Sequence, residues 1–275
     1  MQTAYAPRQF EDRASAPAFE LRLAADEADR RAAQRLRYDV FVRELGGDGP
    51  LVDHARGLER DRFDAHADHL MLLDRAREAR GLSPVVGVYR LMREEQARAA
   101  GGFYSAAEYD LAPLLGSGRR LLELGRSCLH PEYRGGAAMM HLWGGLAEYV
   151  ERHGIELMFG VASFHGTDVA ALAEPLSLLH ARHLAPEEIR PRALPGHFQS
   201  MDLVPRDQID RRRAMLATPA LIKAYLRLGG FVGEGAFVDH AFNTTDVCLV
   251  LDTARLNPRQ REIYTRRGGS GGNGA

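Results

Sequence analysis

The chain has 275 residues, of which 45% are apolar, and a formal net charge of −1. This length and composition are typical of a globular protein with a well-buried core, and the near-neutral charge excludes a general electrostatic field for nucleic acid. No apolar run approaches the ~20 residues that span a bilayer and the chain shows no secretory signal, so we expect a cytoplasmic protein.

The cysteines and histidines do not form a disulfide or metal-binding pattern. Cys128 and Cys248 each lie in an apolar, strand-like run, which favours two reduced and buried thiols. The close histidine pairs at 66/69 and 180/183 have no further ligand at a useful spacing, so we expect no metal site.

The N-terminal part of the chain predicts a strand, a helix and then a strand. After a polar segment (1–17) that we expect to be flexible, FELRLAA alternates as a strand. Asp26 then caps a helix whose apolar residues repeat every four positions until Gly46. A loop with the sequence ERDRFDAHADH leads into the next strand.

The central segment predicts three strands without intervening helices. These strands cover 68–75, 83–92 and 119–129, and a helix over 133–152 and a strand over 155–163 follow. This order indicates an α/β fold with a mixed central sheet and helices on both faces.

A C-terminal extension follows this core. It contains a helix over 168–184, a proline-rich link, a helix capped by Thr218 with Pro219 in its first turn, and a strand over 244–252. We therefore expect a core domain over 18–165, an extension over 166–266 packed on it, and a disordered glycine-rich tail over 267–275.

The stretch RLLELGRSCLHPEYRGG carries two ions in a buried strand. Glu123 and Arg126 would point to opposite faces of a regular strand, because their separation is odd. A β-bulge at Gly125 would bring both to one face and free backbone N–H groups for a ligand carbonyl. Gly135 and Gly136, at the start of the next helix, provide N–H groups for an anion.

Other charged residues support a site here. Arg90 shares a face with the core residues of its strand and therefore needs a partner or a cleft. Arg37 and Phe41 are neighbours on the first helix, and Asp61 and Asp64 lie just before the next strand.

These residues resemble a known family. The strand, proline, PEYRGG and helix look like the acyl-donor motif of the GNAT acyltransferases. The ordered set of Arg37 with Phe41, ExDxFD, GxxR and ExxR is similar to the branch that contains acyl-homoserine-lactone synthases and ornithine N-acyltransferases. TPALIKAYLRLGG and FVGEGAFVDHAFNTTDVCLVLD extend the resemblance to ornithine N-acyltransferases through the extension, to about residue 265.

The resemblance implies transfer of a 3-hydroxyacyl group from the phosphopantetheine of acyl carrier protein to the α-amine of ornithine, without a permanently bound cofactor. Glu123 would act as base, and Arg126 or Arg90 would hold the amino-acid carboxylate or brace the loop with Asp61 and Asp64, which could receive the ornithine ammonium. Backbone groups of the donor motif would bind the thioester and phosphate: Ser127, Cys128, Leu129, Arg134, Gly135 and Gly136.

Two departures from the motifs bear on alternatives. Gly47 stands where lactone synthases carry tryptophan, which counts against that activity, and RGGAA lacks the second glycine of the usual donor motif. A non-catalytic lipid- or carrier-binding protein is the other alternative, disfavoured by the intact motif charges.

Two arginine-rich regions suggest partners. The first helix, with Arg30, Arg31 and Arg35, together with Arg134, would suit acidic acyl carrier protein. The segment 206–227 mixes basic and apolar residues, as do segments that contact an anionic membrane, here the inner face of the cytoplasmic membrane. Acyl-chain length, the choice of ornithine over glycine, lysine or glutamine, and the oligomeric state do not follow from the sequence.

Overall fold

A computed structural model describes residues 16–135 and 137–256. The predictions for the first fifteen residues, for Gly136 and for the glycine-rich tail concern residues outside this part. The strands are β1 (Phe19–Leu23), β2 (Asp68–Asp74), β3 (Val85–Arg93), β4 (Tyr109–Asp110), β5 (Leu121–Leu129), β6 (Leu157–His165), β7 (Arg192–Ala193), β8 (Phe198–Gln199), β9 (Phe231–Val232), β10 (Ala236–Asp239) and β11 (Thr244–Asp252).

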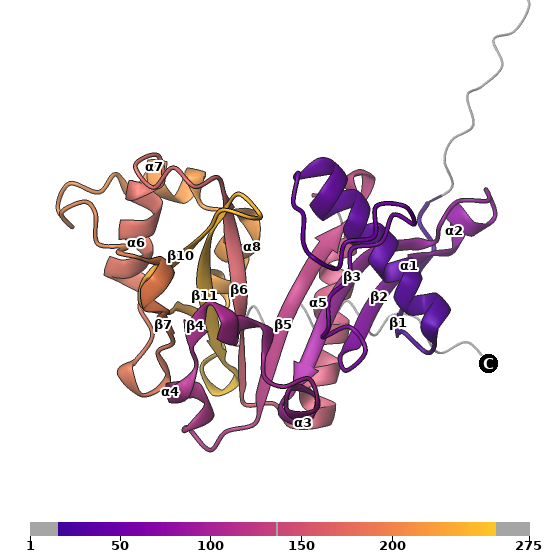
Figure 1. The fold of residues 1–275 in the computed structure, drawn as a ribbon, viewed down its shortest axis with the longest axis horizontal. Coiled ribbons are helices and arrows are strands. Elements are labelled where there is room, and N and C mark those ends of the chain that lie inside the picture. The colour runs from indigo at the N-terminus through magenta and orange to yellow at the C-terminus, as the bar shows by residue number, and fades with distance from the viewer. Residues whose placement is uncertain (1–15, 136, 257–275) are drawn as a thin grey trace, which may run out of the picture.

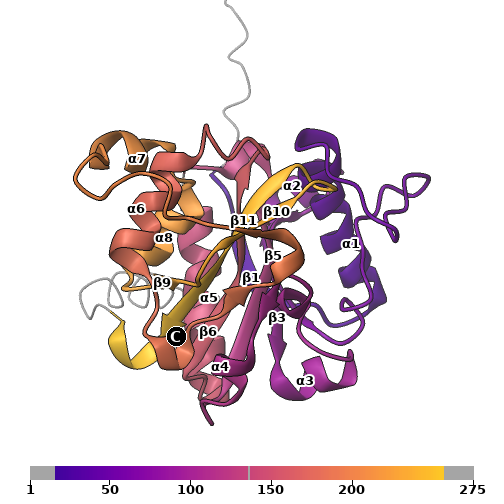
Figure 2. The ribbon, with the colours of Figure 1, turned by 60° about the vertical axis from the view of Figure 1, so that its left-hand side comes forward.

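The α-helices lie on both sides of these strands (Figures 1 and 2). They are α1 (Glu27–Arg37), α2 (Arg75–Glu78), α3 (Glu94–Ala99), α4 (Ala112–Leu115), α5 (Ala138–His153), α6 (Ala173–His183), α7 (Arg211–Ala217) and α8 (Ala220–Arg227). No helix in the described parts of the chain is long and apolar enough to cross a membrane.

One mixed sheet organises the molecule. Its strand order is β1-β2-β3-β5-β6-β11-β10-β8, with β9 paired to β11, while β4 and β7 form a separate pair. The β5–β6 contact is parallel and the other neighbours in the sheet are antiparallel. The predicted α/β fold with a mixed sheet is confirmed, and the strand of the C-terminal extension, β11, pairs with β6 along its full length.

The two sheet faces have separate apolar clusters. One cluster packs α5 and α8 on residues such as Leu124, Met158 and Leu249, and we call this side the α5 face. On the other side, Phe159, Cys248 and Val250 pack against the segment between α3 and α4, and we call this side the α3 face. The alternation of side chains along each strand sends neighbouring residues to the two faces.

Several local predictions are corrected by the structure. The first helix changes to a π-helix over Tyr38–Glu44 instead of continuing as an α-helix. Thr218 closes α7 and does not cap α8, whose N-cap is Pro219. Helix α5 begins at Ala138, because a short 3₁₀ turn over Pro131–Tyr133 separates it from β5.

Candidate active site

Strand β5 breaks its pleat where Glu123 and Arg126 lie. Val88 pairs with Cys128 and Arg90 with Gly125, so two β5 residues oppose the single residue between them on β3. Arg126 has a φ of 50°, in the left-handed region that non-glycine residues rarely adopt. The predicted bulge is therefore present, directly after Gly125.

The bulge places Glu123 and Arg126 on one side of the strand. Glu123 accepts hydrogen bonds from the N–H groups of Tyr104 and Ser105, at 2.9 and 2.6 Å. The Arg126 guanidinium lies 4.5 Å from the centroid of the Tyr104 ring. Both ions thus meet the same short segment on the α3 face.

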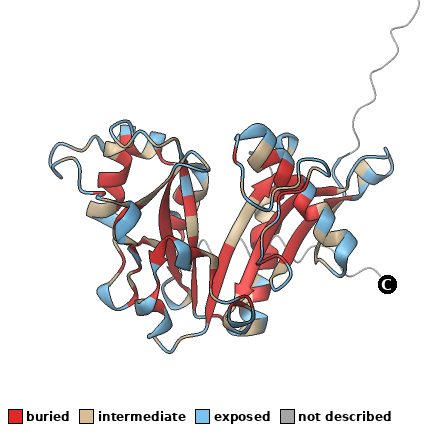
Figure 3. Cartoon of the chain, in the orientation of Figure 1, coloured by how far each residue is buried: buried red, intermediate tan, exposed pale blue. Residues whose placement is uncertain are grey.

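Strands β5 and β6 part just beyond Glu123. Their pairing covers only Leu121, Leu122 and Glu123 with Leu157, Met158 and Phe159. Figure 1 shows the two halves of the sheet diverging from this short contact, and Figure 3 shows the middle of β5 changing from buried to half-buried. A cavity of about 420 Å³ lies between the parted strands.

The cavity is lined from both faces of the sheet. Its apolar lobe, on the α5 face, is formed by Leu124, Met158, Leu221, Tyr225, Leu249 and Leu251. Its polar lobe, on the α3 face, is formed by Tyr104, Glu123, Arg126, Ser163, Asp239 and Asp246. A ligand with an apolar chain and a charged end would find a matching environment for each part.

Three arginines and three acidic residues from the predicted motifs form one buried ion-pair network beside the polar lobe. Its members are Arg37, Arg90, Arg126, Glu59, Asp61 and Asp64. Three positive and three negative charges cancel. The ionic residues of the sequence motifs therefore form a single three-dimensional cluster, with the exception of Glu123.

Arg37 and Arg90 are the most deeply buried arginines of the network. Arg37 Nη1 lies 2.7 Å from Asp64 Oδ1, and its Nε lies 2.5 Å from Glu59 Oε2. Arg90 Nη1 lies 2.6 Å from Asp61 Oδ1 and 3.1 Å from Asp64 Oδ1. Burial alone would raise the pKa of Asp64, but the two guanidinium groups outweigh burial and lower it.

Arg126 closes the network toward the cavity. Its Nε lies 3.1 Å from Glu59 Oε1, and its Nη2 lies 3.2 Å from Asp61 Oδ2. Burial would raise the pKa of Asp61, and Arg90 and Arg126 lower it below its usual range. These contacts hold the loop that carries Asp61 and Asp64 against β3 and β5.

Glu123 differs from the network carboxylates because backbone N–H groups, and no guanidinium, hold it. It is 4% exposed and lines the cavity. Burial raises its pKa, and the hydrogen bonds from Ser105 and Tyr104 offset part of that effect. A buried carboxylate with a raised pKa beside a cavity has the properties of a general base.

A second acidic group, not identified from the sequence, consists of Asp246, which lines the polar lobe, and its electrostatic neighbour Glu108, which is not a lining residue of the cavity. Asp246 and Glu108 are each 5% exposed, and each has one carboxyl oxygen without a hydrogen-bond partner among the described residues. Burial, and then the charge of Asp246, raises the pKa of Glu108 to about 9, while burial raises that of Asp246 to about 6. We call these two residues the acidic pair.

The remaining predicted residues lie in different environments. Phe41 and Ser127 line the cavity, whereas Cys128 and Leu129 belong to buried apolar clusters. Arg134 binds Glu44 at 2.5 and 2.7 Å, and Gly135 has a φ of 73°. Trp143 packs in the core, with its ring centroid 5.2 Å from that of Tyr225.

Gly47 lies against a residue of the C-terminal extension. A Cβ atom at Gly47 would lie 2.8 Å from the Phe242 ring and 2.9 Å from the carbonyl oxygen of Phe41. All three residues line the cavity. Phe242 therefore leaves no room at position 47 for a tryptophan, the residue that the sequence comparison with lactone synthases would place there.

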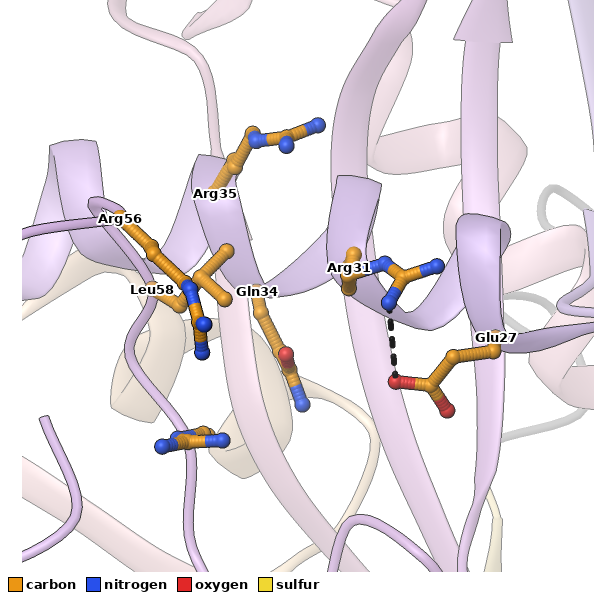
Figure 4. Close-up of a pocket in the computed structure, with 7 residues that line it drawn as sticks. Glu27, Arg31, Gln34, Arg35, Arg56 and Leu58 are labelled. Atoms are coloured by element: carbon orange, nitrogen blue, oxygen red, sulfur yellow. Dashed lines mark ion pairs between the residues drawn. The ribbon is translucent and has the colours of Figure 1, made fainter. Parts of the chain in front are cut away.

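A separate basic cleft lies outside the sheet, on α1 and the segment 56–60 (Figure 4). Arg31, Arg35, Arg56 and Arg60 border it together with Gln34 and Leu58. Glu27 lies at its end and pairs with Arg31 at 4.0 Å. Asp53 pairs with Arg56 and Arg60 at 3.5 and 3.7 Å, so the four arginines face two carboxylates and this surface keeps an excess of positive charge.

Comparison with known proteins places the chain among acyltransferases. Residues 36–144 match the model described as an acetyltransferase (GNAT) domain. The chain is 62% identical over 255 residues to an L-ornithine N(alpha)-acyltransferase of Rhodobacter capsulatus, covering 92% of this chain and 98% of that protein. A protein of the same name from Brucella abortus is 46% identical over 247 residues, or 89% of this chain and 88% of that protein.

A solved structure shares the fold. The N-acyl amino acid synthase FeeM from uncultured soil microbes superposes with a TM-score of 0.50 at 13% identity, covering 87% of this chain and 93% of that chain. Both comparisons agree with the α/β fold described above.

Proposed function

The chain belongs to the L-ornithine N(alpha)-acyltransferase family, which has the GNAT fold, and from this premise we propose how it acylates L-ornithine. In the proposed reaction a fatty acyl group, taken to be a 3-hydroxyacyl group, passes from the phosphopantetheine thioester of acyl carrier protein to the α-amine. An amide forms and the carrier thiol leaves. The cavity between the parted β5 and β6, apolar on one face and charged on the other, is the observation that carries this proposal.

Glu123 is the proposed base. An α-ammonium group has a pKa of ~8 or higher, so most of it must lose a proton before it can attack a thioester at neutral pH. Glu123 lines the polar lobe, and burial raises its pKa, which suits a group that accepts a proton directly or through water. The hydrogen bonds from Tyr104 and Ser105 fix its orientation.

Backbone N–H groups of the bulge are the proposed oxyanion donors. Attack on the thioester carbon places negative charge on its oxygen, and one well-placed donor stabilises such a charge by roughly 3 kcal/mol. The pairing of β5 with β6 ends at Glu123, and Arg126 and Ser127 both oppose one residue of β3. This local break makes N–H groups near Ser127 available on the cavity side.

The apolar lobe is the proposed site of the acyl chain. Leu124, Met158, Leu249 and Leu251 bring apolar side chains from three strands, and Leu221 adds one from α8. Burial of an acyl chain there contributes about 0.8 kcal/mol for each methylene group. The ion-pair network then has a supporting role, since Arg37 and Arg90 hold the loop with Asp61 and Asp64 and do not line the cavity.

The basic cleft of Figure 4 is the proposed contact for acyl carrier protein. Acyl carrier protein is acidic, and Arg31, Arg35, Arg56 and Arg60 offer complementary charge. Arg134 is a weaker candidate, because Glu44 already binds its guanidinium. A double substitution, Arg35→Glu with Arg56→Glu, should raise the KM for the carrier protein and leave the KM for ornithine unchanged.

A peripheral membrane contact is proposed for α7. Leu216 is 73% exposed, and Arg211, Arg212 and Lys223 surround it. An exposed apolar side chain within a basic rim favours anionic lipid surfaces. In a flotation assay, Leu216→Ser should reduce binding to phosphatidylglycerol vesicles, and equal binding by both proteins would contradict the contact.

One assay tests the central proposal. The purified protein is incubated with 3-hydroxyacyl carrier protein and L-ornithine, and thiol release and product mass are followed. We expect a stoichiometric thiol and an N-acyl ornithine. Thiol release with S-adenosylmethionine and not with ornithine would instead indicate a lactone synthase, and no thiol release with either would indicate a binding protein.

A further inference from the structure

We propose that the carboxyl groups of the acidic pair, Asp246 and Glu108, bind the side-chain ammonium of the amino-acid substrate and so select a diamino acid. This inference rests on the proposed acylation of ornithine and names the group that recognises its side chain. Asp246 lies in the stretch FVGEGAFVDHAFNTTDVCLVLD that carries the resemblance, but the sequence assigns no role to Asp246 or to Glu108.

The fold brings Asp246 of the polar lobe together with Glu108, which is not itself a lining residue of the cavity, through two separate elements. Asp246 on β11 alternates with Cys248 and Val250, so its side chain is on the α3 face, like that of Glu123. Asp246 also lines the cavity. The Tyr109 hydroxyl lies 2.9 Å from the Asp246 carbonyl oxygen and 3.0 Å from that of Gly235, which fixes the segment containing Glu108 against β11.

Both members of the pair have unused hydrogen-bonding capacity. Asp246 Oδ1 and Glu108 Oε2 are buried and find no hydrogen-bond partner among residues 16–135 and 137–256. Leaving such an oxygen unpaired costs about 1–3 kcal/mol, and more for an ion. A bound ammonium group, with three N–H donors, would satisfy both oxygens.

The electrostatic surroundings favour a cation over a neutral group. Besides the pair itself, the titratable groups that face it are the carboxylates of Asp239 and Glu123, the guanidinium of Arg126, the phenols of Tyr104 and Tyr109 and the thiol of Cys248. The hydroxyl groups of Ser163 and Thr244 also act on Asp246 and lower its pKa. Arg126 is already bound to Glu59 and Asp61, so its charge is largely compensated. Within the described residues, no group of three or more His, Cys, Asp or Glu side chains is arranged to hold a metal ion.

The network carboxylates are poor candidates for the same task. The sequence left Asp61 and Asp64 as possible receivers of the ornithine ammonium. In the structure, Asp61 binds Arg90 and Arg126, and Asp64 binds Arg37 and Arg90. An incoming ammonium would have to displace a buried guanidinium, whereas Asp246 and Glu108 have no cation to lose.

Protonation of the pair gives a signature of binding. Burial and the neighbouring charge of Asp246 keep Glu108 protonated at neutral pH. An ammonium between the two carboxyl groups would favour the ionised form of both and lower both pKa values. Binding of ornithine at pH 7 should therefore release protons, whereas norvaline, which lacks the side-chain amine, should release fewer.

The experiment uses the full-length protein with acylated carrier protein as the acyl donor. It compares kcat/KM for two acceptor amino acids, L-ornithine and L-norvaline. For Asp246→Asn we expect the ratio of kcat/KM for L-ornithine to that for L-norvaline to fall at least about 30-fold, the size of one charge-assisted hydrogen bond. Glu108→Gln should lower the same ratio. Asp110→Asn, an exposed residue two positions from Glu108, makes the matched charge change outside the cavity and should leave the ratio unchanged.

Proton release is measured on the unmodified protein, by calorimetry in two buffers of different ionisation enthalpy, and does not depend on a variant that folds. An unchanged ornithine-to-norvaline ratio in both variants, equal losses for the two amino acids, or equal proton release would each overturn the inference. If the unmodified protein acylates no ornithine, the proposed function itself fails. If it acylates ornithine and the ratio does not move, only this inference fails.

Discussion

Two groups of buried charge flank the cavity, and they differ in whether their charges are paired. In the ion-pair network, Arg37, Arg90 and Arg126 match three carboxylates at hydrogen-bonding distance. In the acidic pair, Asp246 and Glu108 keep unpartnered oxygens although both are 5% exposed. A buried cluster whose charges are all paired supports the fold. A buried cluster with unpaired oxygens lowers stability, but those oxygens can still bind a ligand.

The two groups also predict opposite dependences of stability on pH. The pKa values of Asp61 and Asp64 are lowered by guanidinium groups, so their contribution is present above pH ~4 and is lost as the pH falls. The pKa values of Asp246 and Glu108 are raised by burial. The folded state then binds more protons than the unfolded state, and stability falls as the pH rises toward the folded pKa.

The largest expected effect comes from breaking the paired group. Arg37→Ala leaves Glu59 and Asp64 without their shared guanidinium, and we expect a loss of about 3–5 kcal/mol in the free energy of unfolding, measured by urea denaturation. Arg35→Ala, at an exposed position on the same helix, is the control and should change stability little. A loss below ~1 kcal/mol for Arg37→Ala would mean that the network does not stabilise the fold.

The second-largest effect is expected at Glu123, whose carboxylate forms no ion pair with the network or with the acidic pair and is held by backbone N–H groups. Glu123→Gln removes the basicity of the side chain, so kcat should fall about 100-fold. Its amide NH2 group must face one of the two backbone N–H donors, so the thermal unfolding midpoint should fall by a few degrees while the protein remains folded. Glu156→Gln is the matched control, since its carboxylate also accepts a backbone N–H, from Arg120, at an exposed site. An unchanged kcat would exclude Glu123 as the base.

The pH dependence of the acidic pair gives a smaller effect. The midpoint of thermal unfolding should fall between pH 6 and pH 9, because Glu108, with a pKa of about 9, must ionise in a buried site. Glu108→Gln cannot ionise and should flatten this slope, with a higher midpoint than the unmodified protein at pH 9. Identical slopes for the two proteins would show that Glu108 is not protonated in the fold.

The smallest effect is expected at an exposed ion pair. Arg43 and Asp39 lie 2.9 Å apart with side chains 69% and 52% exposed. Arg43→Ala should change the free energy of unfolding by less than about 0.5 kcal/mol, as for other exposed pairs on one helix turn. A loss approaching that of Arg37→Ala would mean that burial does not separate the two kinds of pair.

Much of the fold follows from local patterns in the sequence. The strand predicted over 244–252 has the observed bounds of β11, because apolar residues fill it and the polar residues Asn243 and Thr253 flank it. The order of strands does not follow, since the pairing of β11 with β6 depends on contacts between distant segments. The π-helix after α1 has no sequence signal of its own that periodicity would reveal.

The sequence identified the motif residues of the candidate site, but it did not identify the acidic pair. The ionic residues Glu123 and Arg126 interrupt an apolar strand, and the bulge that unites them was expected for that reason. Asp246 carries a similar signal, a charge in phase with Cys248 and Val250, yet it lies in a stretch of the resemblance to whose residues no role was assigned. Glu108 lies in a segment without apolar periodicity, and only the tertiary fold brings it to β11.

The early parting of β5 from β6 makes one opening accessible from both sides of a single sheet. In the proposed reaction the fatty chain binds on the α5 face and the amino acid binds on the α3 face. Substitutions at Leu249 then change binding of the acyl chain and substitutions at Asp246 change binding of the amino acid, although both residues lie on β11. Distant sites with no shared contacts usually contribute additively. Lipid tail and head group could then diversify independently in this family, each by changes confined to its own side.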